Sequence, residues 1–120
     1  AVMYQPITVW KTALHQKRPY LSLSDAFEAI TFIHANKLFN GEIYNVLTDN
    51  LTVDDIIQMI KTHVPELNIE FVDTKIMNQL SYEVENYKIK ERGLKLTGSV
   101  SACVRDTIDL LKGINNSHVQ

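Results

Sequence analysis

The chain has 120 residues, of which 45% are hydrophobic and 22% are charged, values typical of a single globular domain rather than of a disordered or collagen-like chain. A formal net charge of −2 argues against a general binder of nucleic-acid phosphates, and no apolar run is long enough to span a membrane. The single cysteine excludes an internal disulfide framework, so we expect a cytoplasmic protein. From the charge and the missing apolar run, we expect it to bind no nucleic acid and no membrane.

The first third of the chain predicts two short strands followed by a helix. Residues 7–10 (ITVW) form a β-rich run, and residues 20–23 (YLSL) form a second one. Asp25 is expected to cap a helix, because Glu28 follows three residues later, as in a capping box. The apolar positions within residues 26–38 fall near one helical face and support that helix.

The middle of the chain predicts a strand, a helix and a further strand. Residues 43–47 (IYNVL) have the composition of a strand. Residues 52–55 (TVDD) form a second capping-box pattern, and the apolar positions of residues 53–64 give a clear helical stripe that ends at Pro65. Residues 69–72 then predict another strand.

The last third of the chain predicts two helices. Residues 86–92 indicate a short helix that ends at Gly93 in a left-handed conformation. The last helix is expected to start at Ser99 or Ser101 and to end at Gly113. The resulting order, β-β-α-β-α-β-α-α, predicts a mixed α/β fold with short strands and about four helices. Because the strands are so short, we expect several of them to complete a sheet that another segment supplies.

Most catalytic signatures are missing from this sequence. The four glycines form neither a G-x-G-x-x-G turn nor a P-loop, and the four histidines have no metal-ligand spacing. No tyrosine is followed four residues later by a lysine. A reaction centre, if the protein is an enzyme, is therefore expected to lie outside this chain.

Three pairs of motifs occur in a specific order along the chain. They are PITVW at residues 6–10 with RPYLSLSDA at 18–26, GEIYNV at 41–46 with LTVDDI at 51–56, and residues 75–82 with KIKERGL at 88–94. Their order and spacing resemble the C-terminal part of the extended short-chain dehydrogenase/reductases, the NAD-dependent epimerase/dehydratase family that includes the nucleotide-sugar epimerases.

This resemblance implies that the chain is a fragment from which the N-terminal Rossmann half is absent. Residues 1–113 would be the C-terminal substrate-binding domain. The polar composition of residues 114–120 (INNSHVQ), which follow Gly113, separately predicts a flexible tail. The intact protein would use NAD or NADP, whereas we expect no catalytic residue, cofactor site or metal site on this fragment. Its partners would be a sugar or nucleotide-sugar substrate and its own missing Rossmann half, or a second copy of the chain.

The same resemblance implies four substrate-binding residues. Arg18 would reach a substrate diphosphate, because a planar guanidinium can bind phosphate oxygens through two parallel hydrogen bonds. Lys75, Asn78 and Tyr82 stand where the family places residues that contact the diphosphate, the ribose and the ring. The alternatives are a solvated or paired loop arginine and an ordinary surface connection at residues 75–82.

A second hypothesis for the whole chain is a free-standing module with the same fold that binds, regulates or oligomerises without catalysis. The coding sequence upstream of Ala1 distinguishes the two hypotheses. A glycine-rich turn and a Tyr-x-x-x-Lys pair there would favour the enzyme, and a start codon immediately before Ala1 would favour the module.

Overall fold

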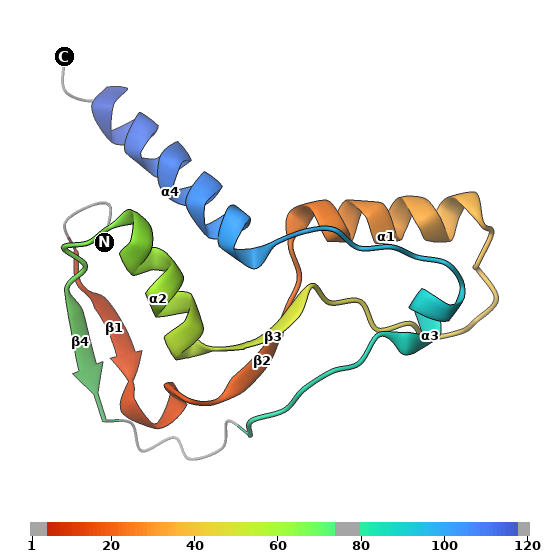
Figure 1. Ribbon diagram of the computed structural model, residues 1–120, viewed down its shortest axis with the longest axis horizontal. Coiled ribbons are helices and arrows are strands. Elements are labelled where there is room, and N and C mark those ends of the chain that lie inside the picture. The colour runs from red at the N-terminus through yellow and green to blue at the C-terminus, as the bar shows by residue number, and fades with distance from the viewer. Residues whose placement is uncertain (1–4, 74–79, 118–120) are drawn as a thin grey trace.

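The computed structural model describes residues 5–73 and 80–117 of the chain. In chain order the elements are β1 (Ile7–Trp10), a single 3-10 turn η1 (Lys11–Ala13), β2 (Lys17–Tyr20), α1 (Leu23–Ala35), β3 (Asp49–Thr52), α2 (Val53–His63), β4 (Ile69–Val72), α3 (Tyr87–Glu91) and α4 (Val100–Ser117). This order confirms the predicted mixed α/β fold with four helices and short strands (Figure 1).

The strands form two separate two-stranded sheets. β1 pairs in parallel with β4, in a register that runs from Ile7 opposite Ile69 to Trp10 opposite Val72. β2 pairs antiparallel with β3, with Lys17 opposite Thr52. Because two isolated strands bury little surface, each pair depends on the helices and segments around it.

Two predicted strands are misplaced along the sequence. The second strand is β2 (Lys17–Tyr20) rather than residues 20–23, because α1 already begins at Leu23. The strand expected at residues 43–47 does not form; the strand in this region is β3, which starts at Asp49. Within the described part of the chain, no other strand lies in register beside residues 43–47.

The N-terminal cap of α1 also differs from the prediction. Ser22, not Asp25, is the cap, and its Oγ accepts a hydrogen bond from the Asp25 backbone N–H at 3.1 Å. Asp25 is only 1% exposed, and its carboxylate accepts instead from Thr48 Oγ1 at 2.6 Å and from the Gly98 N–H at 2.7 Å. Asp25 thus joins three parts of the chain that are far apart in sequence: the start of α1, the segment before β3 and the segment before α4.

The predicted ends of the other helices are partly right. The capping box of α2 is present, with Thr52 and Asp55 bonded reciprocally. Gly93 follows α3 with a φ of +106°, the predicted left-handed conformation. The prediction that Gly113 ends the last helix is wrong, because α4 continues to Ser117; a glycine within a helix costs only about 1 kcal/mol. The tail expected from residue 114 is therefore helical up to Ser117, and residues 118–120 lie outside the described residues.

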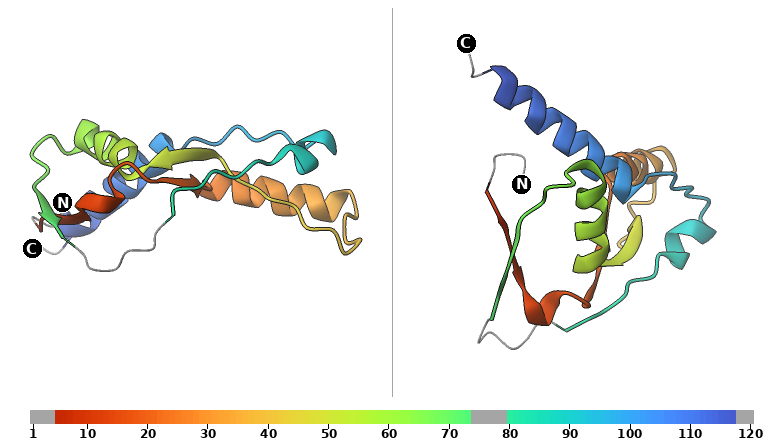
Figure 2. Two further views of the ribbon diagram at one scale, coloured as in Figure 1. Left: turned by 90° about the horizontal axis from the view of Figure 1, so that it is seen from below. Right: turned by 60° about the vertical axis from the view of Figure 1, so that its left-hand side comes forward.

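The apolar core is small, and the molecule is flat. Ala29, Ile89 and Leu94 form a buried cluster, against which pack Phe32, Ile33, Tyr44, Val46 and Leu96. The molecule measures 49 × 43 × 21 Å, and Figure 2 shows its thin side. Among the helices that the structure describes, none is both long and apolar enough to cross a membrane.

Candidate substrate-binding site

The structure brings together two of the four predicted binding residues, Arg18 and Tyr82. The Arg18 guanidinium carbon lies 5.1 Å from the centre of the Tyr82 ring, in a cation–π contact. Arg18 belongs to β2, and Tyr82 lies in the segment that leads to α3, so the contact joins residues far apart in the sequence. An exposed contact of this kind contributes about 0.5–1 kcal/mol.

Much of the hydrogen-bonding capacity of Arg18 is used within the chain. Nη1 donates to the backbone carbonyls of Lys17, at 2.8 Å, and Leu80, and Nη2 donates to Gln16 Oε1 at 3.2 Å. A guanidinium held in this way has a defined orientation. It has correspondingly fewer N–H groups left to grip a phosphate through two parallel bonds.

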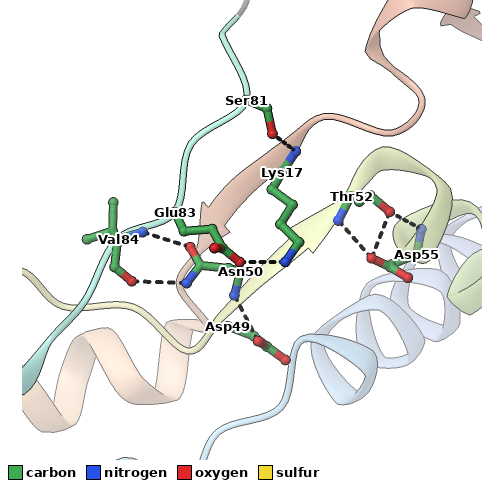
Figure 3. Close-up of polar contacts among 8 residues, drawn as sticks. All are labelled: Lys17, Asp49, Asn50, Thr52, Asp55, Ser81, Glu83 and Val84. Atoms are coloured by element: carbon green, nitrogen blue, oxygen red, sulfur yellow. Dashed lines mark hydrogen bonds and ion pairs between the residues drawn. The ribbon is translucent and has the colours of Figure 1, made fainter.

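Residues 80–84, which we call the 80–84 segment, are bonded to β2 at several points (Figure 3). The Lys17 backbone N–H donates to Ser81 Oγ at 2.9 Å, and the Tyr82 N–H donates to the Lys17 carbonyl at 3.3 Å. The Lys17 ammonium pairs with Glu83 Oε1 at 2.5 Å. These contacts hold the Tyr82 backbone beside β2.

Asn50 fixes the same segment from β3. Its Nδ2 donates to the Val84 carbonyl, and its Oδ1 accepts from the Val84 N–H, both at 3.0 Å. The side-chain amide thereby reproduces the pair of bonds that a neighbouring strand would make (Figure 3). Asn50 was not among the predicted site residues. No local sequence pattern indicated this role, because its partner Val84 is 34 residues away.

The electrostatics of the site combine paired charges of both signs. The hydrogen bond and charge of Glu83 raise the pKa of Lys17, and the Asp55 and Asp49 carboxylates act in the same direction. The Lys17–Glu83 pair is about half-exposed, so its contribution to stability is small. Within the described residues, no cluster of three His, Cys, Asp or Glu side chains could hold a metal ion.

The other two predicted binding residues, Lys75 and Asn78, lie in residues 74–79, outside the described residues. Their role stays a prediction. The first described residue after them is Leu80, whose carbonyl accepts from Arg18, so the 80–84 segment begins directly at this site.

Two apolar grooves lie elsewhere on the surface. The first, of about 610 Å³, is lined by Tyr20 and Leu21 at the end of β2 and by one face of α4, including Cys103 and Ile108. The second lies between α1 and the start of α4 and shares Cys103 and Thr107 with the first. Neither Arg18 nor Tyr82 lines these two grooves, so the grooves are surfaces separate from the polar site.

Comparison with known proteins shows the fold. No family model and no curated protein matches the chain. Among solved structures, a partial consensus L-threonine 3-dehydrogenase matches with a TM-score of 0.71 and 20% identity, over 93% of this chain and 39% of that one. An NAD-dependent NDP-hexosamine 5,6-dehydratase involved in tunicamycin biosynthesis, TunA, matches with a TM-score of 0.68 and 15% identity, over 88% of this chain and 35% of that one. The chain thus has the fold of part of these enzymes and spans little more than a third of their length.

Proposed function

We propose that this chain is the C-terminal substrate-binding part of an NAD- or NADP-dependent enzyme of the extended short-chain dehydrogenase/reductase type. The observation that carries the proposal is the fold likeness, which extends over 93% of this chain but only 39% of an L-threonine 3-dehydrogenase. The remainder of the enzyme would supply the nucleotide-binding fold, the catalytic base and the cofactor. The chain alone would be inactive, and the protein would be cytoplasmic.

Within this proposal, the substrate lies beside Arg18 and Tyr82. The 5.1 Å stack between them supports this assignment, because it unites a cation and an aromatic ring from distant parts of the sequence. Lys75 and Asn78 would reach the substrate from the segment preceding residue 80. A tyrosine ring offers an apolar face to a sugar or base and a hydroxyl to its polar groups.

The first candidate substrate is a sugar or nucleotide-sugar, the class of compound for which the NDP-hexosamine dehydratase is named. A second candidate is a smaller substrate without a diphosphate, such as an amino or hydroxy acid. Two observations favour the second: Arg18 already donates to three oxygen atoms of the chain, and the L-threonine 3-dehydrogenase is named for an amino acid.

The test uses the complete polypeptide that contains this sequence. NADH formation is followed by absorbance with amino and hydroxy acids, and conversion of nucleotide-sugars is followed by chromatography. The Arg18→Lys variant is expected to raise KM about tenfold for a diphosphate substrate and less for a small acid, because lysine cannot form two parallel bonds to phosphate. No NAD-dependent conversion of either substrate class would refute the proposal.

Calorimetry on the 120-residue chain tests whether the cofactor site lies outside this chain. Titration with NAD is expected to give no specific heat of binding, since the cofactor site would belong to the absent part. Micromolar binding of NAD would contradict this assignment. A reading frame that starts immediately before Ala1 would favour the free-standing binding, regulatory or oligomerisation module.

A further inference from the structure

Tyr82 is held beside Arg18 by few bonds of its own. The ring stacks on the guanidinium at 5.1 Å, yet Tyr82 is 51% exposed. Within the described part of the chain, one backbone–backbone hydrogen bond attaches the 80–84 segment to its surroundings, from the Tyr82 N–H to the Lys17 carbonyl at 3.3 Å. This distance exceeds the usual value of about 2.9–3.0 Å. The position of Tyr82 therefore depends on side-chain contacts with the segment.

The contacts at the start of the segment are too exposed to fix the ring. Lys17 and Glu83 lie 2.5 Å apart, but both side chains are about half-exposed. Exposed ion pairs contribute little, because water screens the charges and two long side chains lose conformational freedom. Ser81 adds one hydrogen bond, from the Lys17 N–H to a hydroxyl that rotates freely. A stronger constraint on Tyr82 has to come from the other end of the segment.

Beyond the segment, the chain is anchored in the core. Asn86 is 5% exposed, and its Nδ2 donates to the Leu47 carbonyl at 3.1 Å. Ile89, in α3, is 0% exposed. Tyr82 lies four residues before Asn86, however, and four extended residues span up to about 13 Å. The core anchor alone therefore leaves the Tyr82 ring room to move away from Arg18.

Asn50 supplies the constraint between Tyr82 and the core. Its amide bonds both the N–H and the carbonyl of Val84, each at 3.0 Å, and Val84 is only two residues from Tyr82 (Figure 3). These bonds are partly buried, so water competes less for them than for the Lys17–Glu83 pair. Only one orientation of the amide makes both bonds, because the reverse would place donor against donor and acceptor against acceptor.

We propose that Asn50 is a positioning residue of the candidate substrate-binding site. By holding the Val84 backbone, it keeps the Tyr82 ring stacked on Arg18, and it thereby sets the affinity for the substrate without touching the substrate itself. A substrate then meets both groups already in place, which removes the entropic cost of ordering an exposed ring during binding. The inference rests on the proposed function in placing the substrate beside Arg18 and Tyr82.

Steady-state kinetics of the complete polypeptide tests the inference. The probes are L-threonine and an NDP-hexosamine, one for each candidate substrate class. For the probe that is converted, Asn50→Ala is expected to raise KM about tenfold and to change kcat less than about twofold, because binding weakens while the catalytic groups, which would lie outside this chain, are untouched. An unchanged KM, or a loss confined to kcat, would overturn the inference.

The matched control is Asp49→Asn, at the neighbouring exposed position of β3. Asp49 Oδ1 accepts from the Asn50 backbone N–H at 2.8 Å, and an asparagine at position 49 keeps such an oxygen. This variant is expected to leave KM unchanged. A tenfold rise in KM for the control as well would overturn the inference, because the effect would then not depend on the bonds to Val84.

A double-mutant cycle shows whether Asn50 acts through Tyr82. In a Tyr82→Ala background, Asn50→Ala is expected to raise KM by less than about a further twofold, because the ring that Asn50 positions is already absent. A merely structural contribution of Asn50 would raise KM equally in both backgrounds. An equal rise would therefore overturn the inference.

Hydrogen exchange separates failure of this inference from failure of the proposed function. In the Asn50→Ala variant of the complete polypeptide, the amides of Tyr82 and Val84 are expected to exchange at least about tenfold faster than in the parent, whichever probe is converted. Unchanged exchange overturns the inference, and with one probe still converted it leaves the proposed function standing. Faster exchange in a polypeptide that converts neither probe refutes the proposed function but supports the hold of Asn50 on Tyr82.

Discussion

The hydrogen-bonded cluster around Asp25 leaves no space for a side chain at position 98. A Cβ atom added at Gly98 would lie 2.1 Å from Ser22 Oγ and 2.6 Å from both Cγ and Oδ1 of Asp25. Real contacts essentially never come this close, and the atoms concerned are buried and already bonded. The Gly98→Ala variant must therefore displace either Asp25 or the segment that leads into α4.

Either displacement breaks the hydrogen bond from the Gly98 N–H to Asp25 and strains the bond from Thr48. A hydrogen bond to a charged group contributes about 1.5–3 kcal/mol. Overpacking a closely packed site costs about 1–3 kcal/mol. We therefore expect Gly98→Ala to lower the free energy of unfolding by about 3–5 kcal/mol, which is a large effect for one methyl group.

Urea unfolding followed by far-ultraviolet circular dichroism measures this change. Gly113→Ala is the matched control, because it adds the same methyl group inside α4, where a Cβ meets nothing within 4 Å. The control is expected to stabilise the protein by about 0.5–1 kcal/mol, since alanine favours the helix over glycine. A Gly98→Ala variant within about 1 kcal/mol of the parent chain would refute the geometry of the Asp25 cluster.

Three further predictions concern β3, the start of α2 and the 80–84 segment. Thr52→Ala removes the N-terminal cap of α2 and is expected to cost about 1 kcal/mol in the free energy of unfolding, measured with urea. Hydrogen bonds from the Thr52 N–H and hydroxyl lower the pKa of Asp55 from its ordinary value of 3.8. The stabilisation by the ionised Asp55 is complete above pH 3.8 and is lost as the pH falls through the lower pKa of the folded state. Asp55→Asn should therefore lower the free energy of unfolding at neutral pH and have a shrinking effect below pH 3.8. A constant effect across the acidic range would contradict the assignment. Asn50→Asp keeps the acceptor for the Val84 N–H but loses the donor to the Val84 carbonyl. Limited proteolysis and hydrogen exchange of the 80–84 segment should therefore both accelerate. The control Asp49→Asn, at the exposed neighbouring position, should leave both rates unchanged.

The local elements of this chain follow from short-range rules that act within a few residues. The capping box at Thr52 and Asp55, the apolar stripe of α2 and the left-handed Gly93 were predictable because each depends on a hydrogen bond or a backbone angle close in sequence. The order of strands and helices was predictable for the same reason. Hydrophobic periodicity gives no pairing partners, however, and the pairing of β1 with β4, which lie near opposite ends of the first 72 residues, came only from the structure.

The candidate site shows the same division. Arg18 and Tyr82 were selected by resemblance, but only the tertiary structure brings them into contact and shows that Arg18 donates to backbone carbonyls. The role of Asn50 was not predictable, because its partner Val84 is 34 residues away and no local pattern specifies it.

The sequence by itself determined the fold class, most element positions and the capping box of α2, since these depend on local geometry and side-chain chemistry. The tertiary structure decided where the strands pair, how Asp25 is used and where the 80–84 segment is attached, because these depend on groups that meet only after the chain has folded. Residues 43–47 show the physical reason most directly: their sequence favours a strand, but a strand exists only where a neighbouring backbone accepts and donates its hydrogen bonds.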